Sequence, residues 1–313
     1  MATDILAYPP LQQSDPFARP THHERYPEAQ ILRDIYRTTG YPETQQGQAT
    51  MTAIMRGSTA AYFDGKALHF RHPKSDIDIV AVTGEAGQSG AQYLFYNVPT
   101  ADAQVRELDI LCFTPARLHA EERDPYRVFL VTKLIQPGIP ILAAEAYEAY
   151  KVIAIATLMV QGAARQGRTR ITPSGGARLM LEEDMFAEPW RWQSLRTYYI
   201  TSPTAEHQRH LLTYFSHRAL KRLEQVGIAR EVSHEYKKPA EPVYSLDTTH
   251  IRYTHPFLDR LRTIYWFVYD QFRVLFHSDT SSFNLDNGIR VFLKFASLTR
   301  NPTLRYDADL VFG

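Results

Sequence analysis

The stretch "RGSTAAYFDGKALHFRHPKSDIDIVAV", residues 56–82, holds two acidic side chains inside an apolar, β-branched run. Within "SDIDIVAVTG" (75–84), Asp76 and Asp78 alternate with isoleucines, and this period of two is typical of a β-strand. The pattern therefore predicts that both aspartates project from the same face of one strand.

Two further strands are predicted downstream, at 91–98 and 105–113, and the second carries another acidic pair. Glu107 and Asp109 share a face by the same period of two. Carboxylates two residues apart on a strand lie about 7 Å from each other, and a third on a neighbouring strand makes a cluster that a cation must neutralise. Oxygen ligands without His or Cys favour Mg²⁺ over zinc, and Mg²⁺ usually bridges carboxylates and substrate phosphates. The predicted Mg²⁺ site therefore points to a nucleotide as the ligand.

The whole chain is predicted to be α+β, with an N-terminal mixed-sheet domain followed by a mostly helical domain. The predicted divisions are an extended arm over 1–26, the mixed-sheet domain over 27–143 and the helical domain over 144–313. A first helix is predicted at 27–39 and a short β-ribbon at 61–70, around Asp64-Gly65. Apolar spacing predicts the later helices at 144–165, 176–186, 191–199, 205–227 and 256–277.

The composition limits which partners and which cellular compartment the sequence predicts. The 35 Lys and Arg residues against 34 Asp and Glu give a net charge of +1 with the histidines neutral, so no global field recruits nucleic acid or a membrane. One cysteine, Cys112, excludes an internal disulfide framework. The most apolar helical run, 141–160, carries three charged residues and is predicted to be a core helix rather than a membrane span. A cytoplasmic protein without a membrane partner is the expectation.

The order of the motifs resembles the DNA polymerase β superfamily of nucleotidyltransferases. That family has Gly-Ser, then Asp-x-Asp at a strand, then a further acid on an adjacent strand. The resemblance covers about 31–142, and the gap between the first two motifs is longer than the family usually shows, the excess being a predicted insertion at 62–71. The matching pieces are Gly57-Ser58, Asp76-Ile77-Asp78 and Asp109.

The resemblance implies an enzyme that transfers a nucleoside monophosphate from a nucleoside triphosphate such as ATP to an acceptor hydroxyl, with pyrophosphate release and two Mg²⁺ ions. It implies that Asp76 and Asp78 hold the metals. Asp109 would ligate the catalytic metal only and help to deprotonate the acceptor. Gly57 would permit close backbone approach, and Ser58 would offer its hydroxyl and N–H to the β- and γ-phosphates.

Each assignment has an alternative. Glu107 competes with Asp109 for the place of the third acid, and Asp109 is preferred because apolar residues flank it. Ser58 is alternatively a turn hydroxyl, and the paired aspartates are alternatively the solvated face of an edge strand. The phosphate groups of a bound triphosphate also need positively charged partners. Each candidate for this role is alternatively a solvated surface side chain. The first candidate is Lys133, and the others are Lys151, Arg56 and Lys74.

The acceptor is predicted from residues 207–238, which hold seven Lys and Arg against three Glu, with Tyr214, Phe215 and Tyr236 interleaved. Such a segment can track an RNA backbone, so RNA or tRNA is the predicted acceptor, in an enzyme related to toxins or defence. The alternative is an amphipathic helix with a solvated basic face. A small-molecule or protein acceptor, or a non-catalytic nucleotide- or RNA-binding module, also remains open. The aromatic segment 261–279 is predicted to be a helix buried on nearly all sides.

Overall fold

The computed structural model places most of the chain from residue 50 to residue 276. The residues that it describes are 50–63, 70, 75–86, 90–100, 104–182, 195–253 and 255–276. The predicted arm at 1–26, the predicted helix at 27–39 and most of the predicted ribbon at 61–70 lie outside these residues.

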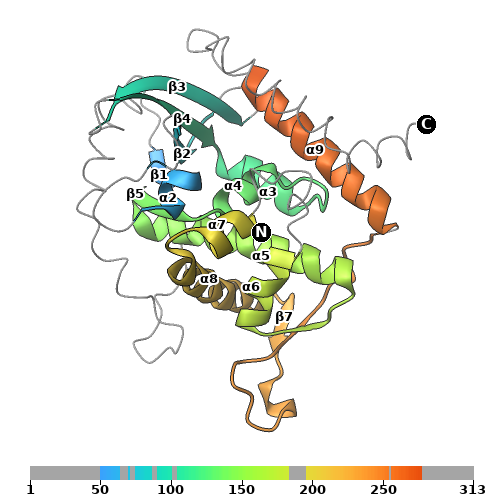
Figure 1. Ribbon diagram of the computed structural model, residues 1–313. Helices are drawn as coiled ribbons and strands as arrows, with labels where there is room; N and C mark the ends of the chain where they lie inside the picture. Colours follow the sequence, from blue (N-terminus) through green and yellow to red (C-terminus); the bar gives the residue numbers. More distant parts are fainter. Residues whose placement is uncertain are drawn as a thin grey trace.

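A five-stranded mixed sheet forms the N-terminal part, with the strand order β3-β4-β2-β1-β5 (Figure 1). β2 and β4 are parallel, and the other neighbouring pairs are antiparallel. The three strands predicted from period-two patterns are confirmed, with Asp76 lying just before β2. The strands are β1 (Thr50–Arg56), β2 (Ile77–Thr83), β3 (Ala91–Pro99), β4 (Val105–Phe113) and β5 (Gly138–Leu142).

Helices dominate the chain after the sheet, as predicted, so the fold is α+β. Figure 1 shows α5 between the sheet and α8, and α5 also packs against α4 and α6. Alternate strand residues explain the packing, because Ile54 and Val80 face these helices while Met55 and Ile79 belong to a smaller cluster on the other face. The helices are α2 (Gly57–Ala61), α3 (Pro115–Glu122), α4 (Phe129–Ile135), α5 (Ala144–Gln166), α6 (Pro173–Glu182), α7 (Leu195–Thr201), α8 (Ala205–Gln225) and α9 (Pro256–Phe276).

The run 141–160 becomes most of α5, whose residues from Tyr147 to Ala156 are buried, so the prediction of a core helix is confirmed. In the described part of the chain, every helix is too short or too polar to cross a bilayer.

A second, small sheet in the C-terminal part was not predicted. Its order is β6-β8-β7, and a single 3₁₀ turn, Ser233–Glu235, follows β7. Strands of two or three residues are too short to show a period of two, which is why the sequence pattern indicated only helices and loops there. The strands are β6 (Arg170–Ile171), β7 (Ala229–Glu231) and β8 (Tyr244–Leu246).

The prediction that the helix at 261–279 is buried on nearly all sides is wrong for one face of α9. Phe267 and Val274 are buried against the core, whereas Tyr265 is 61% exposed and Tyr269 is 43% exposed. Among the elements that the structure describes, α9 packs mainly against α4 and β3, which cover one of its faces. Its other side carries aromatic rings that contact one another and the solvent.

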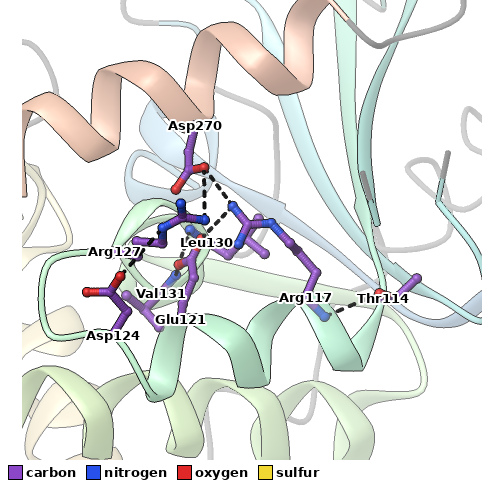
Figure 2. A network of polar contacts seen from close by, with 8 residues as sticks. All are labelled: Thr114, Arg117, Glu121, Asp124, Arg127, Leu130, Val131 and Asp270. Atoms are coloured by element: carbon purple, nitrogen blue, oxygen red, sulfur yellow. Dashed lines mark hydrogen bonds and ion pairs between the residues drawn. The ribbon is translucent and has the colours of Figure 1, made fainter. Parts of the chain in front are cut away.

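A buried ionic network fastens α9 to α3 and α4. Figure 2 shows the side chains of Arg117 and Arg127 directed at the carboxylate of Asp270. The Arg117 guanidinium lies 2.9 Å from Asp270 Oδ1, and that of Arg127 lies 3.8 Å from the same oxygen. Asp270 is fully buried, so these cations replace the water that would otherwise solvate its charge.

Glu121 completes the network from α3 (Figure 2). Its Oε2 accepts hydrogen bonds from the backbone N–H groups of Leu130 at 2.7 Å and Val131 at 3.2 Å, which are orphan donors in the first turn of α4. Its Oε1 lies 3.6 Å from the Arg117 guanidinium. Burial raises the pKa of Glu121 to about 8, and the contact with Arg117 only partly offsets this.

We expect Glu121→Gln to remove part of the pH dependence of stability. The pKa of Glu121 is raised in the folded protein, so its protonated form is favoured there. Protonation of Glu121 therefore adds to the free energy of unfolding, and this stabilisation is complete below the unfolded pKa of about 4.3. It is lost as the pH rises towards 8. The Gln side chain keeps an oxygen for Leu130 but has no charge to gain, so the free energy of unfolding should fall less between pH 5 and pH 8.

Urea denaturation across this pH range measures the effect, and Glu206→Gln, at an exposed position of α8, is the control. A Glu121→Gln variant with the same pH slope as the wild type would contradict the assignment.

Candidate functional site

The predicted site residues meet where β1, β2 and β4 lie side by side. β2 and β4 run parallel, and Asp78 and Asp109 are direct partners in their register. On the other side of β2, Arg56 at the end of β1 is the partner of Asp78. Residues far apart in the sequence are thereby brought to one place in the sheet.

Three carboxylates form a cluster at this place. Asp76, Glu107 and Asp109 each offer one oxygen, and these oxygens all lie within 4.8 Å of one another. Each of the three side chains is half-buried. Both candidates for the third acid therefore lie in the cluster, and which of them ligates a metal stays a prediction. Like charges at this separation repel, and a cation between them reverses the sign of the interaction.

Asp78 has a different environment from the acidic cluster. Its Oδ1 lies 2.9 Å from the guanidinium of Arg56, which is buried. Burial is the largest single effect on the pKa of Arg56 and lowers it, but the charge of Asp78 and smaller contributions from Tyr93, Tyr198 and Asp109 together raise it by more, so the net direction is up. Arg56 also donates a hydrogen bond of 3.1 Å to Oε1 of Gln136. Arg56 thus neutralises Asp78, and the predicted metal ligation by Asp78 remains a prediction.

The Gly-Ser motif lies directly against Asp78. Gly57 has a φ of +75°, which side chains disfavour, and a Cβ added there would lie 2.5 Å from Oδ2 of Asp78. The motif opens the short helix α2 rather than a simple turn, and Ser58 is its second residue. The hydroxyl of Thr59 donates to the backbone oxygen of Asp76 at 2.9 Å, which holds α2 against the start of β2.

We expect Gly57→Ala to lower the free energy of unfolding by about 1–2 kcal/mol from the left-handed backbone alone, and by more from the contact with Asp78. Gly167→Ala is a matched control, because Gly167 has a φ of +62° but nothing within 4 Å of an added Cβ. Chemical denaturation of both variants separates the two effects. Equal losses would contradict a close approach of Asp78 to the Gly57 backbone.

The two predicted lysines are not solvated surface side chains, and that alternative is wrong. Lys133 and Lys151 are each only 3% exposed, because α9 and α8 cover the helices that carry them. The ammonium of Lys133 lies over the rings of Phe129 and Phe267, at 5.6 and 5.7 Å, on the side of α9. Binding of a triphosphate by Lys133 stays a prediction, and Lys74 lies outside the described residues.

Lys151 is connected to the acids through Gln136, a residue that sequence patterns did not single out. Its ammonium donates a 2.8 Å hydrogen bond to the backbone oxygen of Gln136, whose side chain accepts from Arg56. Burial lowers the pKa of Lys151 to about 7. No local signal marks Gln136, because it follows α4 without any periodic pattern and its contacts are with β1 and α5.

The basic segment 207–238 folds mainly as α8. It has the character of an amphipathic helix, which is the alternative to a segment that tracks RNA. Phe215 and Tyr214 are buried, so neither ring is presented for stacking on bases. Arg218 pairs with Glu148 at 2.6 Å, and Lys221 pairs with two glutamates. These ion pairs neutralise part of the excess positive charge of the segment. Its binding to RNA stays a prediction.

No known protein family matches this chain, and no curated protein matches it. The resemblance to nucleotidyltransferases therefore depends on the residues and their geometry.

Proposed function

We propose that this protein is a Mg²⁺-dependent nucleotidyltransferase that moves a nucleoside monophosphate from a nucleoside triphosphate to an acceptor hydroxyl. The observation that carries the proposal is the convergence of Asp76, Glu107 and Asp109 within 4.8 Å, beside a Gly-Ser motif packed on Asp78. The Gly-Ser motif opens α2, Asp76 and Asp78 lie at the start of β2, and Glu107 and Asp109 lie on β4, so their meeting supports a common role.

The acidic cluster suits Mg²⁺ by its chemistry. Three carboxylates without His or Cys are oxygen-only ligands, which hard divalent cations prefer. Asp76, Glu107 and Asp109 would hold the ion, with Asp78 as a further ligand if its carboxylate is released from Arg56. Bound there, Mg²⁺ supplies the positive charge that the α-phosphate and the departing pyrophosphate require.

The residues of the chain then have distinct roles. A carboxylate oxygen of Asp109 accepts the proton of the acceptor hydroxyl while the hydroxyl oxygen attacks the α-phosphorus. The bond from the α-phosphorus to the bridging oxygen breaks, and pyrophosphate leaves with its electron pair. Gly57, lacking a Cβ, lets the triphosphate approach the backbone, and Ser58 offers its N–H and hydroxyl. Arg56 keeps Asp78 in place.

RNA is the acceptor that we propose, on the basis of the cations of 207–238 that remain exposed. Arg230, Lys237 and Lys238 are exposed and lie around the small C-terminal sheet. Cations of this kind attract the phosphate backbone without reading its sequence. Tyr214 and Phe215 are buried, so of the three aromatic side chains named in this segment Tyr236, which is 38% exposed, is the one open to stacking on a base.

The test is incubation with each α-labelled nucleoside triphosphate, Mg²⁺ and a total RNA pool, followed by separation of RNA, protein and small molecules. We expect label in the RNA fraction with the wild type and none with Asp76→Ala/Asp109→Ala. Glu145→Ala, at an exposed position of α5, is the control and should label RNA as the wild type does.

The outcomes are distinct. Label in protein or in a small molecule would support nucleotidyl transfer and contradict RNA as the acceptor. Thermal stabilisation by a triphosphate with Mg²⁺, without label anywhere, would indicate a non-catalytic nucleotide-binding module. If neither label nor stabilisation is observed, the proposal is overturned.

A further inference from the structure

α9 lies along one edge of the described fold, beside α4 and β3 (Figure 1). The side chains that it exposes follow one another at steps of three or four residues, so they share one side of the helix. Single exposed apolar side chains are common, but a continuous row of them marks an interaction site. This row, the α9 stripe, comprises Leu258, Arg262, Tyr265, Tyr269 and Arg273.

Two tyrosine rings at the centre of the α9 stripe are available for stacking. The rings of Tyr265 and Tyr269 have their centroids 6.2 Å apart, and their planes are inclined by only 19°. Trp266 lies 5.4 Å from each of them and is steeply inclined to both, and the guanidinium of Arg127 lies 4.3 Å from a ring centroid of Trp266. These neighbours order the two tyrosines, whose exposed fractions of 61% and 43% leave aromatic surface open to a partner.

The exposed charge of the α9 stripe is positive. Arg262 and Arg273 flank the tyrosines and lie about 16 Å apart along the helix axis. Both acidic side chains of α9 are buried instead. Asp259 accepts a 2.9 Å hydrogen bond from the hydroxyl of Tyr126, and Asp270 belongs to the arginine network of Figure 2. The charge of this surface therefore complements a polyanion.

We propose that the α9 stripe binds a single-stranded segment of RNA, with bases stacked on Tyr265 and Tyr269 and phosphates at Arg262 and Arg273. Aromatic rings among cations bind single strands without reading their sequence, because every base has a π face. A membrane surface fits less well, since interfacial helices expose several Trp, Phe or Leu side chains and the stripe has one aliphatic residue, Leu258.

The choice of RNA as the strand rests on the proposed function, in which RNA is the acceptor. Stacking on α9 itself requires neither a metal ion nor turnover. Binding to α9 and nucleotidyl transfer can therefore be measured separately.

The test of stacking is the fluorescence anisotropy of labelled, single-stranded oligouridine with the full chain in EDTA. The wild type binds, and Tyr265→Leu/Tyr269→Leu weakens binding about 10-fold or more, because leucine has no π face. Tyr265→Phe/Tyr269→Phe keeps the rings and binds as the wild type does. A surface that merely buried apolar area, against a protein or a lipid, would tolerate leucine.

The phosphate contacts have their own variants. Arg262→Gln and Arg273→Gln each reduce the slope of the logarithm of the binding constant against that of the salt concentration by about 0.7, the contribution of one phosphate of a single strand. Arg178→Gln, an equal loss of charge at an exposed position of α6, leaves the slope unchanged.

Lack of RNA binding by the wild type, or equal binding by Tyr265→Leu/Tyr269→Leu, overturns the inference. Binding that is lost in Tyr236→Leu and kept in that double variant assigns the RNA to residues 207–238 and also overturns it. Binding to anionic vesicles without binding to RNA identifies a membrane instead. Tighter binding of oligothymidylate than of oligouridine contradicts RNA as the partner.

Failure of this inference is distinct from failure of the proposed function. Transfer of label to RNA by the wild type, with binding unchanged in Tyr265→Leu/Tyr269→Leu, overturns the α9 site and leaves nucleotidyl transfer in place. Binding that depends on the two tyrosines, without label in any fraction, supports the α9 site and contradicts transfer.

Discussion

Asp270→Asn is expected to lower the free energy of unfolding by about 3–5 kcal/mol, the usual cost of leaving a buried charge without its partner. Asp270 is fully buried, and its Oδ1 lies 2.9 Å from Arg117 and within 3.8 Å of Arg127. The asparagine keeps the size of the side chain but removes the charge that Arg117 and Arg127 share, which leaves Arg117 beside Glu121 and Arg127 beside Asp124. Because the network joins α9 to α3 and α4, the loss should appear first as release of α9 (Figure 2).

Chemical denaturation measures this loss, and Arg273→Gln, on the exposed side of the same helix, is the control and should change stability by less than about 0.5 kcal/mol. A double variant, Arg117→Met/Asp270→Leu, keeps the prediction testable if the single variant does not fold. Replacing both partners by apolar side chains is often nearly neutral, so the double variant should be more stable than Asp270→Asn. A loss below about 1 kcal/mol in Asp270→Asn would contradict the network's role.

Single Asn or Gln substitutions at Asp76, Glu107 and Asp109 are each expected to reduce nucleotidyl transfer by at least about 100-fold. The expected size follows from the several kcal/mol of transition-state stabilisation that a bound metal supplies. Each substitution removes one negative oxygen from the cluster of 4.8 Å, so each should also raise the Mg²⁺ concentration needed for half-maximal rate. Initial rates across a Mg²⁺ series measure both effects.

Asp78→Asn separates metal ligation from positioning. Its Oδ1 contacts Arg56, so a positioning role predicts a slower reaction with an unchanged Mg²⁺ requirement. Metal ligation by Asp78, as the resemblance implies, predicts a raised requirement like that of the cluster variants. Glu145→Gln, exposed on α5, is the matched control for loss of a carboxylate and should match the wild type. Full activity in all three cluster variants would contradict the proposed function.

The strands and the acidic faces were predictable because a period of two is a property of the extended backbone itself. The pattern in 75–84 predicts β2, and that in 105–113 predicts β4 and places Glu107 with Asp109. Neither pattern contains the register between the two strands, which sets Asp78 beside Asp109. The period of two places Glu107 and Asp109 on one face of β4, so it does not choose between them, and the structure brings both into the cluster with Asp76.

The lysines show how tertiary packing overrides a general tendency. Lysine is almost never fully buried, so a surface position is the natural expectation for Lys133 and Lys151. Both are buried because α9 covers α4 and α8 covers α5, and each covering helix lies much later in the chain than the helix it covers. The partial burial of α9 depends in the same way on which neighbours it has.

By itself, the amino-acid sequence determined the α+β class, the three central strands, the core helix α5 and the acidic pairs, because these follow from local periods and from residue chemistry. Only the tertiary structure decided that Asp76 joins Glu107 and Asp109 while Asp78 pairs with Arg56. The physical reason is that these are contacts between segments far apart in the chain. Strand register and helix packing set their distances, and no local pattern encodes either.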